Sequence, residues 1–367
     1  MIAFNKSVRG FSHITKNIEC QDSSKTSDIN TIIADCFLVA VADGHGDRTC
    51  IRSQIGSNLA VQSAINVVEE FLCESRGVDG GAYQLFIDDE NYTVKILTDT
   101  IIYEWLKRVH NDFNSSPLTD KEREDSGNYL KLYEQGTEIE HAYGTTLLIA
   151  LVTKEYIILI HQGDGRCIVF WEDGSCEQPV KWDDKCDANI TTSMCDENAA
   201  ERIRHAFIPL NGKKPMAVFL TSDGVEDAYP DIDGAYAFLR DVLVNDLAEG
   251  TREEIEDRMQ ETLAYYSEHG SGDDMSIAGV IDQELIKARA DALTKLRNDY
   301  MIDTKKATLQ NRLKSMRRKD IILHERAEDA ENEEQKRHYI SEYEEYHSEY
   351  VNLKKQLEDL LQEEREK

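Results

Sequence analysis

The residues of this chain that could do chemistry are aspartates next to glycines. The first example is Asp43-Gly44-His45-Gly46, which directly follows the apolar run 37–42. That run has the length and composition of a buried strand, so Asp43 would be held rigidly at a strand end. The two glycines let the backbone approach whatever Asp43 binds. A carboxylate and a bare carbonyl suit a hard divalent cation, although the same residue types also form ordinary tight turns.

Further aspartates repeat or mirror this plan. Asp164 and Asp223 follow apolar runs and precede a glycine, and Asp227 lies one helical turn after Asp223. Asp273 lies just before an apolar run, and Asp22 lies in a polar segment upstream. Strand ends in layered sheets can converge on one rim, where carboxylates repel one another unless a cation neutralises them. The sequence therefore predicts a site for more than one Mg²⁺ or Mn²⁺ ion, rather than zinc.

A pair of such ions suits attack on a phosphate ester. Metal-bound water is a nucleophile near neutral pH, and the ions offset the charge of the phosphoryl oxygens. A nearby histidine can protonate the leaving oxygen, and His45 is the candidate. The alternative for His45 is a purely structural histidine.

Apolar strands and amphipathic helices must position these residues. Strands are predicted at 37–42, 145–152, 156–161, 167–171, 216–221 and 276–281, and helices at 58–73, 94–113, 197–206, 234–247 and 252–267. The polar segments 114–127 and 183–197 are predicted to be a surface loop and a flap. Strands that are neighbours in sequence, with helices grouped between them, favour an α+β layered domain over a βαβ repeat.

Composition limits the classes of binding partner and the cellular compartment that we expect for this protein. The 367 residues carry a net charge of -29, which argues against nucleic acid or an anionic membrane surface as the main partner. The eight cysteines show no zinc spacing and are interpreted as mostly buried free thiols in a reducing compartment. The segment 1–10 lacks an apolar signal core, and no apolar run approaches the ~18 residues that span a bilayer. We therefore expect a cytoplasmic protein.

The composition changes after Asp282. Every Pro, Gly and Cys lies before this point, which predicts a globular domain over 1–282 and a helical coiled-coil tail over 283–367. The tail has one heptad seam made of Tyr339, Tyr343, Tyr346, Tyr350, Leu353, Leu357 and Leu360, and an earlier one made of Ile302, Leu309, Leu313, Met316, Leu323, Ala327 and Ala330. The two registers do not join across 331–337, so a hairpin or a stutter falls there. The tail is interpreted as a dimerisation or docking element; the alternative is a helix that packs on its own domain.

In their order along the chain, the motifs resemble those of the metal-dependent Ser/Thr protein phosphatases of the 2C family. The resemblance is carried by Cys20-Gln21-Asp22, Asp43-Gly44-His45-Gly46, Gly144-Thr145-Thr146, Gly163-Asp164-Gly165-Arg166, Ser222-Asp223-Gly224 with Asp227, and Gly272-Asp273-Asp274-Met275-Ser276. It covers roughly 4–281, and Ser12-His13 ahead of Cys20 resembles a divergent, largely bacterial branch. Each motif is weak alone, but six in the family's order are specific.

The resemblance implies a fold and a set of metal ligands. The implied fold is a sandwich of two antiparallel β-sheets flanked by helices, with the metals in a cleft at one end. Asp43 would bridge two Mn²⁺ or Mg²⁺ ions, and the Gly44 carbonyl would serve one of them. Asp223 and Asp273 would complete the ligands of the other ion. Asp273-Asp274 stands where the family usually has Asp-Asn, and we predict that Asp273 is the ligand.

The resemblance also implies the roles of the remaining residues. Asp164 and Asp227 match the positions that hold a third, weaker ion in some members. Asp22 would orient metal-bound water, and His45 matches the proposed general acid.

One family feature is missing. Asn17 stands where the family often has an arginine that grips the substrate phosphate. His13 is the candidate that replaces this arginine as a substrate-binding residue, with Lys16 and Arg48 as alternatives. The missing arginine affects phosphate affinity more than metal binding.

These observations predict a phosphatase that hydrolyses phosphoserine and phosphothreonine in proteins by metal-activated water, without a covalent intermediate. Its partners would be phosphorylated proteins and, through the tail, a second copy or another protein. The alternative is a pseudophosphatase or phosphoprotein-binding scaffold that acts through the tail. Such a degenerate site would be expected to lack Asp43, Asp223 or Asp273, and all three are present. A phosphatase for small phosphorylated molecules is a third interpretation.

Overall fold

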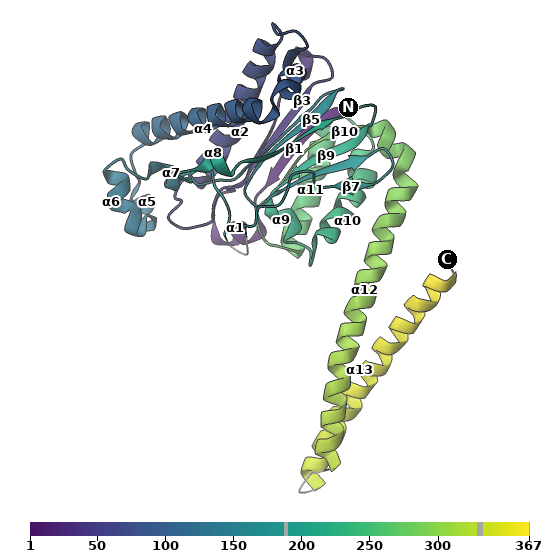
Figure 1. Cartoon of the computed structure of the whole chain (residues 1–367). Coiled ribbons are helices and arrows are strands. Elements are labelled where there is room, and N and C mark those ends of the chain that lie inside the picture. Colours follow the sequence, from purple (N-terminus) through teal and green to yellow (C-terminus); the bar gives the residue numbers. More distant parts are fainter. Residues whose placement is uncertain (187–189, 329–332, 367) are drawn as a thin grey trace. The chain divides into compact units, whose positions relative to one another are not determined.

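The computed structural model describes residues 1–186, 190–328 and 333–366, and it divides into two compact units, Met1–Leu293 and Thr294–Lys367. The first unit contains two five-stranded sheets in which every strand pair is antiparallel (Figure 1). One sheet has the order β1 (Ile2–Val8), β10 (Met275–Ile281), β9 (Pro215–Thr221), β6 (Arg166–Trp171), β7 (Cys176–Glu177). The other has the order β2 (Ser23–Thr26), β3 (Phe37–Ala42), β4 (Leu147–Val152), β5 (Tyr156–Gln162), β8 (Arg204–Pro209). The predicted α+β fold with two antiparallel sheets is confirmed.

The sheets pack face to face and helices cover their outer faces. The layer between the sheets includes Val39 and Leu148 from one sheet and Val218 from the other. The outer face of the sheet that contains β3 packs against α2 (Ser53–Ser75) and α4 (Glu90–Ser115). The other sheet packs against α10 (Ile232–Val242), α11 (Arg252–His269) and the beginning of α12 (Gln283–Glu328). Because both faces of the central strands are buried, these strands are continuously apolar rather than alternating.

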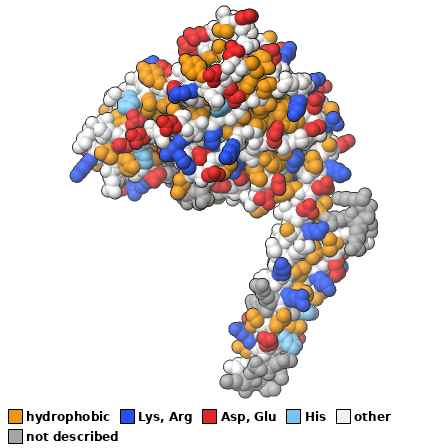
Figure 2. All heavy atoms as spheres, in the orientation of Figure 1, with side chains coloured by type: hydrophobic (Ala, Val, Ile, Leu, Met, Phe, Trp, Pro, Cys, Tyr) orange, Lys and Arg blue, Asp and Glu red, His pale blue; other side chains and the backbone are white. Residues whose placement is uncertain are grey.

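Short elements connect these layers. They are α1 (Phe11–Lys16), η1 (Ile29–Thr31), α3 (Gly81–Asp88), α5 (Asp120–Asp125), η2 (Gly127–Tyr129), α6 (Leu130–Glu134), α7 (Ile139–Ala142), α8 (Ala199–Arg202), α9 (Asp223–Glu226) and η3 (Leu243–Leu247). On the face in Figure 2, acidic and basic side chains are interspersed. No described helix is both long and apolar enough to cross a membrane. All eight cysteines lie in the described part of the chain, and none is in a disulfide.

Two local predictions are wrong. The helix predicted over 197–206 ends at Arg202, and the chain continues as β8, whose pairing with β5 outweighs the local helical pattern. The loop predicted over 114–127 contains α5. That helix begins with a capping box, in which the Thr119 side chain accepts from the Glu122 N–H and the Glu122 carboxylate accepts from the Thr119 N–H.

The second unit is a helical hairpin formed by the later part of α12 and by α13 (Glu333–Glu366). The buried side chains of Leu309 and Met316 on α12 share one cluster with Leu353 and Leu360 on α13. An ion pair joins Arg312 to Glu349. The two seams therefore face each other across a fold-back, which is the hairpin alternative. The seam positions Ala327 and Ala330, and much of 331–337, lie outside the described side chains.

Candidate metal centre

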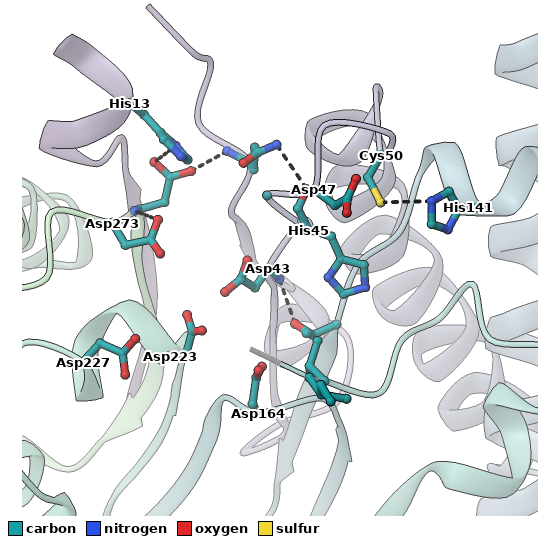
Figure 3. Close-up of a pocket in the computed structure, with 17 residues that line it drawn as sticks. His13, Asp43, His45, Asp47, Cys50, His141, Asp164, Asp223, Asp227 and Asp273 are labelled. Carbon is teal, nitrogen blue, oxygen red and sulfur yellow. Dashed lines mark hydrogen bonds and ion pairs between the residues drawn. The ribbon is translucent and has the colours of Figure 1, made fainter. Parts of the chain in front are cut away.

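The predicted carboxylates surround one cavity. The cavity has a volume of about 540 Å³, and Asp43, Asp164, Asp223, Asp227 and Asp273 all line it. Figure 3 shows their side chains pointing towards a common space, with His45 on the far side of Asp43 from Asp223. They come from the ends of β3 and β5, from α9 at the end of β9, and from the segment before β10. These strand ends meet at one rim because the strands pair antiparallel in register.

The backbone at Asp43 is fixed by hydrogen bonds to the segment before β4. Its N–H donates to the Thr146 hydroxyl (2.9 Å), and its carbonyl accepts from the Thr145 hydroxyl and the Thr146 N–H (both 2.8 Å). Gly44 follows in close contact with two other segments. A Cβ at Gly44 would lie 2.7 Å from the carbonyl oxygens of both Gln21 and Ser53, so no larger residue fits.

Asp223 and Asp227 lie at the two ends of α9. The N–H of Asp227 donates to the carbonyl of Asp223 (2.9 Å), which places the two side chains one turn apart. Asp164 lies two residues after the end of β5, and Thr191 from the 190–198 segment contacts its carboxylate. Three strand ends and one helical turn thus place four carboxylates around the cavity.

Asp273 and Asp274 have different surroundings. Both Asp274 oxygens are engaged: Oδ1 accepts from the Gly10 N–H (2.6 Å) and contacts His13 Nδ1 (3.0 Å), and Oδ2 accepts from the Gln21 N–H (2.6 Å). Asp274 is 4% exposed. Burial alone would raise the pKa of its carboxyl, but these donors together outweigh burial, so the pKa is lowered. Asp273 is exposed and lines the cavity, with one oxygen accepting from the Asp274 N–H. Asp274 therefore anchors the N-terminal segment, and Asp273 faces the cavity.

The acidic cluster is electrostatically strained. Burial, followed by the neighbouring carboxylates Asp22 and Asp223, raises the pKa of Asp43 well above its usual value. Burial raises the pKa of Asp223 to about 6 and, together with Asp274, the pKa of Asp22 to about 8. Like charges in a poorly solvated space disfavour their own ionisation, and a divalent cation removes this penalty.

The donor set fits a hard cation in its chemistry. It consists of carboxylates together with the backbone of Gly44, which is what Mg²⁺ and Mn²⁺ prefer. In the ranges 1–186, 190–328 and 333–366, no three acidic, His or Cys side chains converge tightly enough to hold one ion as they stand.

Asp22 lies away from the cavity lining. It is 6% exposed, and its Oδ2 accepts from the Ser222 hydroxyl (2.8 Å). The Ser222 hydroxyl oxygen also accepts from the Ser276 N–H (2.9 Å), which links β9 to β10 behind the site. Asp22 is thus fixed on the inner side of the carboxylate group.

His45 is held between two segments. Its N–H donates to the Gly144 carbonyl (3.0 Å), and its Nε2 lies 2.7 Å from the Ser193 hydroxyl oxygen. Burial lowers the pKa of His45 to about 4, so the ring is neutral near pH 7 in the ligand-free protein. This neutrality constrains any role of His45 as an acid.

Of the three candidates for binding the substrate phosphate, only His13 is among the residues that line the cavity. The pKa of His13 is raised, chiefly by its hydrogen bond to Asp274. Arg48 is exposed and pairs with Glu124 and Asp125.

Several lining residues were not singled out from the sequence. They include Asp47, Cys50, His141, Ile190 and Thr191. The position of Asp47, an acidic residue four positions after Asp43, was a weak sequence signal that it lies near the cavity. The others are brought to the cavity by contacts between distant segments, which no local pattern marks. Part of the predicted flap, 187–189, lies outside the described residues.

The fold is an α+β sandwich of two antiparallel sheets with an acidic cavity at its rim, and comparison with family models identifies the family. The model of the protein phosphatase 2C family matches residues 9–264. The chain belongs to this family. A comparison with curated proteins gave no match.

Solved structures of phosphatases resemble the chain at low sequence identity. A bacterial serine phosphatase is 16% identical, with 77% of this chain and 99% of that chain covered and a TM-score of 0.45. The Ser/Thr phosphatase Stp1 from Staphylococcus aureus is 16% identical, with 77% and 96% covered and a TM-score of 0.45. The catalytic domain of the phosphatase PstP, in complex with two manganese ions, is 15% identical, with 76% and 98% covered and a TM-score of 0.41.

Proposed function

We propose that this chain is a metal-dependent protein phosphatase that hydrolyses phosphoserine and phosphothreonine. The observation that carries the proposal is that the five predicted aspartates, which come from four segments of the chain, all line one cavity. For most of them, burial and their carboxylate neighbours raise the pKa. A fold that gathers this much negative charge around one cavity gains most from divalent cations.

The residues divide by role in this proposal. Asp43, the Gly44 carbonyl, Asp223 and Asp273 would hold two Mn²⁺ or Mg²⁺ ions. Asp164 and Asp227 would hold a third, weaker one. When bound, such ions supply an activated water and offset the charge of the phosphoryl oxygens.

Two residues outside this set would act on water and on substrate. Asp22 would orient the attacking water from its position behind the carboxylates. His13 would bind the phosphate: its Nδ1 is held by Asp274, and protonation of the ring makes it a cation at the cavity wall.

His45 would protonate the leaving oxygen. Because burial keeps its ring neutral in the free protein, a second change must supply the proton. A phosphate dianion beside the ring favours the imidazolium form, so substrate binding itself would charge His45. The ring would then give this proton to the serine or threonine oxygen as the phosphorus–oxygen bond breaks.

A phosphopeptide panel tests the proposal. The full chain is assayed with Mn²⁺, with Mg²⁺ and with a chelator, on phosphoserine and phosphothreonine peptides and on small phosphorylated metabolite-like esters. We expect metal-dependent phosphate release that is faster from peptides than from small esters. Faster release from small esters would favour the small-molecule interpretation. Peptide binding without turnover under any metal condition would favour the scaffold alternative.

We propose that the tail is an association element. The hairpin buries one apolar seam, yet Met301, Ile321, Ile340 and Val351 remain largely exposed. A two-helix hairpin that pairs with a second copy would cover such side chains in a four-helix bundle. Light scattering on the full chain and on a chain truncated after Leu293 compares their masses. A dimer that becomes a monomer on truncation supports the proposal, and two monomers contradict it.

A further inference from the structure

The hydroxyl of Ser193 is the only hydrogen-bond partner found for the His45 ring in the described part of the chain. Ser193 belongs to the polar segment after residue 189, far from His45 in sequence, and it is 3% exposed. Its own backbone is fixed, since its N–H donates to Asp196 (3.1 Å) and its carbonyl accepts from the Gln162 side chain (2.6 Å). These bonds hold the Ser193 backbone, and the contacts of its Oγ with the N–H groups of Thr145 and Cys195 place the hydroxyl beside His45.

A count of donors around this hydroxyl assigns its proton. The N–H groups of Cys195 (3.2 Å) and Thr145 (3.3 Å) both donate to Ser193 Oγ, and no other acceptor for them is found in the described residues. A hydroxyl oxygen has two lone pairs and one proton. Two further groups lie near this oxygen: Cys195 Sγ at 3.1 Å, which can donate or accept, and the Thr145 carbonyl at 3.1 Å, which can accept. With the lone pairs facing the buried N–H groups, the proton has two acceptors within reach, and the shorter contact, to His45 Nε2 at 2.7 Å, favours His45.

The same count assigns the proton of the His45 ring. A neutral imidazole carries one proton, and a nitrogen that accepts a hydrogen bond cannot carry it. With Nε2 as the acceptor, the proton lies on Nδ1. The Cδ2 edge of the ring packs against Gly144, where a Cβ would lie 2.5 Å from Cδ2. Nδ1 lies on the opposite edge, and the ring lines the metal cavity.

We propose that Ser193 is a positioning residue that holds His45 with its Nδ1–H directed towards the cavity. This inference rests on the proposed role of His45 in leaving-group departure. It adds Ser193 as a residue that acts through His45. It also explains how a neutral His45 ring can still donate a hydrogen bond from Nδ1–H into the cavity. The Thr145 carbonyl, 3.1 Å from Ser193 Oγ, gives the hydroxyl a second acceptor when Nε2 gains a proton.

The first test compares substrates with different leaving groups in the full chain with Mn²⁺. An aryl phosphate has a good leaving group and needs little help, whereas a phosphothreonine peptide has a poor one. For Ser193→Ala we expect kcat on the peptide to fall by about tenfold or more, with KM and the aryl phosphate rate nearly unchanged. Ser193→Thr keeps the hydroxyl and should restore the peptide rate. Added to His45→Ala, the Ser193→Ala change should cost nothing further.

The matched control is Ser63→Ala. Ser63 is also fully buried, but it lies on α2 and its hydroxyl has no partner among the described residues. This variant should leave both rates unchanged. Equal losses on both substrates for Ser193→Ala, or losses that add to those of His45→Ala, would overturn the positioning role.

The second test does not depend on turnover. In ¹⁵N-histidine-labelled full-length protein near pH 7.5, the His45 signals are assigned by their loss in His45→Gln. We expect the Nδ1–H tautomer, and its loss or mixing in Ser193→Ala. An Nε2–H tautomer in the unmodified protein overturns the inference even where Ser193→Ala fails to fold. If neither substrate is hydrolysed with any metal, the proposed function fails, and the tautomer still decides the inference about Ser193.

Discussion

Replacing Asp43 with Asn tests the electrostatic account of the site most directly. In the metal-free protein, burial, followed by the neighbouring carboxylates Asp22 and Asp223, raises the pKa of Asp43. The Asp43→Asn change removes one of these charges and keeps the shape of the side chain. We therefore expect opposite effects on two properties: metal-dependent activity should be lost, and the metal-free fold should become more stable.

The stability effect follows from the pKa shifts and their sign. The pKa of Asp223 is raised from 3.8 to about 6 in the folded protein. At ~1.4 kcal/mol for each pKa unit, this shift corresponds to about 3 kcal/mol. A raised folded-state pKa contributes stability that is fully present below the unfolded value and is lost as the pH rises through the folded value. The metal-free protein should therefore lose stability between about pH 4 and pH 8, the window set by Asp223 and Asp22.

The assay is thermal unfolding of the full chain with a chelator and with Mn²⁺, at about pH 5 and pH 8. At the higher pH, Mn²⁺ should raise the melting temperature of the unmodified protein by several degrees. Asp43→Asn should raise the melting temperature of the metal-free protein and remove most of the increase that Mn²⁺ causes. It should also lower phosphatase activity by about 10³-fold. Asp99→Asn, at an exposed ion pair on α4, is the control and should change neither property. Retained Mn²⁺-dependent turnover, or an unchanged Mn²⁺ stabilisation of Asp43→Asn, would refute the reasoning.

Three further outcomes are expected. His45→Ala should slow phosphothreonine peptides by at least about 100-fold but aryl phosphates far less, and equal losses in steady-state kinetics would remove His45 as the acid. His13→Ala should raise KM for phosphopeptides by about tenfold with little change in kcat, because His13 would bind the phosphate in ground and transition states alike; an unchanged KM would exclude it as the phosphate ligand. A chain that ends at Asp282 lacks the fully buried Ile286 and Leu293, so its free energy of unfolding in urea should be about 3–6 kcal/mol lower than that of a chain that ends at Leu293. Equal urea midpoints for the two chains would show that these side chains add no stability.

The boundary between the units illustrates how composition and packing differ. The loss of Pro and Gly after Asp282 predicts where continuous helix begins, and α12 does begin at Gln283. The compact division of the chain falls later, after Leu293, because the first turns of α12 pack into the core of the sandwich. The predicted domains 1–282 and 283–367 remain a prediction about independent folding, which the truncations address.

Local sequence was sufficient for the central strands and for the aspartates at their ends. An apolar run with Asp-Gly shortly after it is a short-range signal. The strands β3, β5 and β9 all have this pattern. The edge strands β1, β2, β7 and β8 were not predicted. β1 and β8 pair with strands far away in sequence, whereas β2 and β7 are short and carry polar side chains. The apolar seams of the tail were also predicted from local sequence, because a heptad repeat is a local pattern.

Only the tertiary structure shows what makes the neighbours Asp273 and Asp274 different and which residues support the site. Asp273 and Asp274 are identical in type and adjacent in sequence. They differ only because Gly10, His13 and Gln21 surround Asp274 with donors. Ser193 reaches His45 across 148 positions of sequence, so no periodicity could mark it. Periodic patterns record burial, which repeats along an element, whereas a hydrogen bond between two loops occurs once and depends on the packing of the whole sandwich.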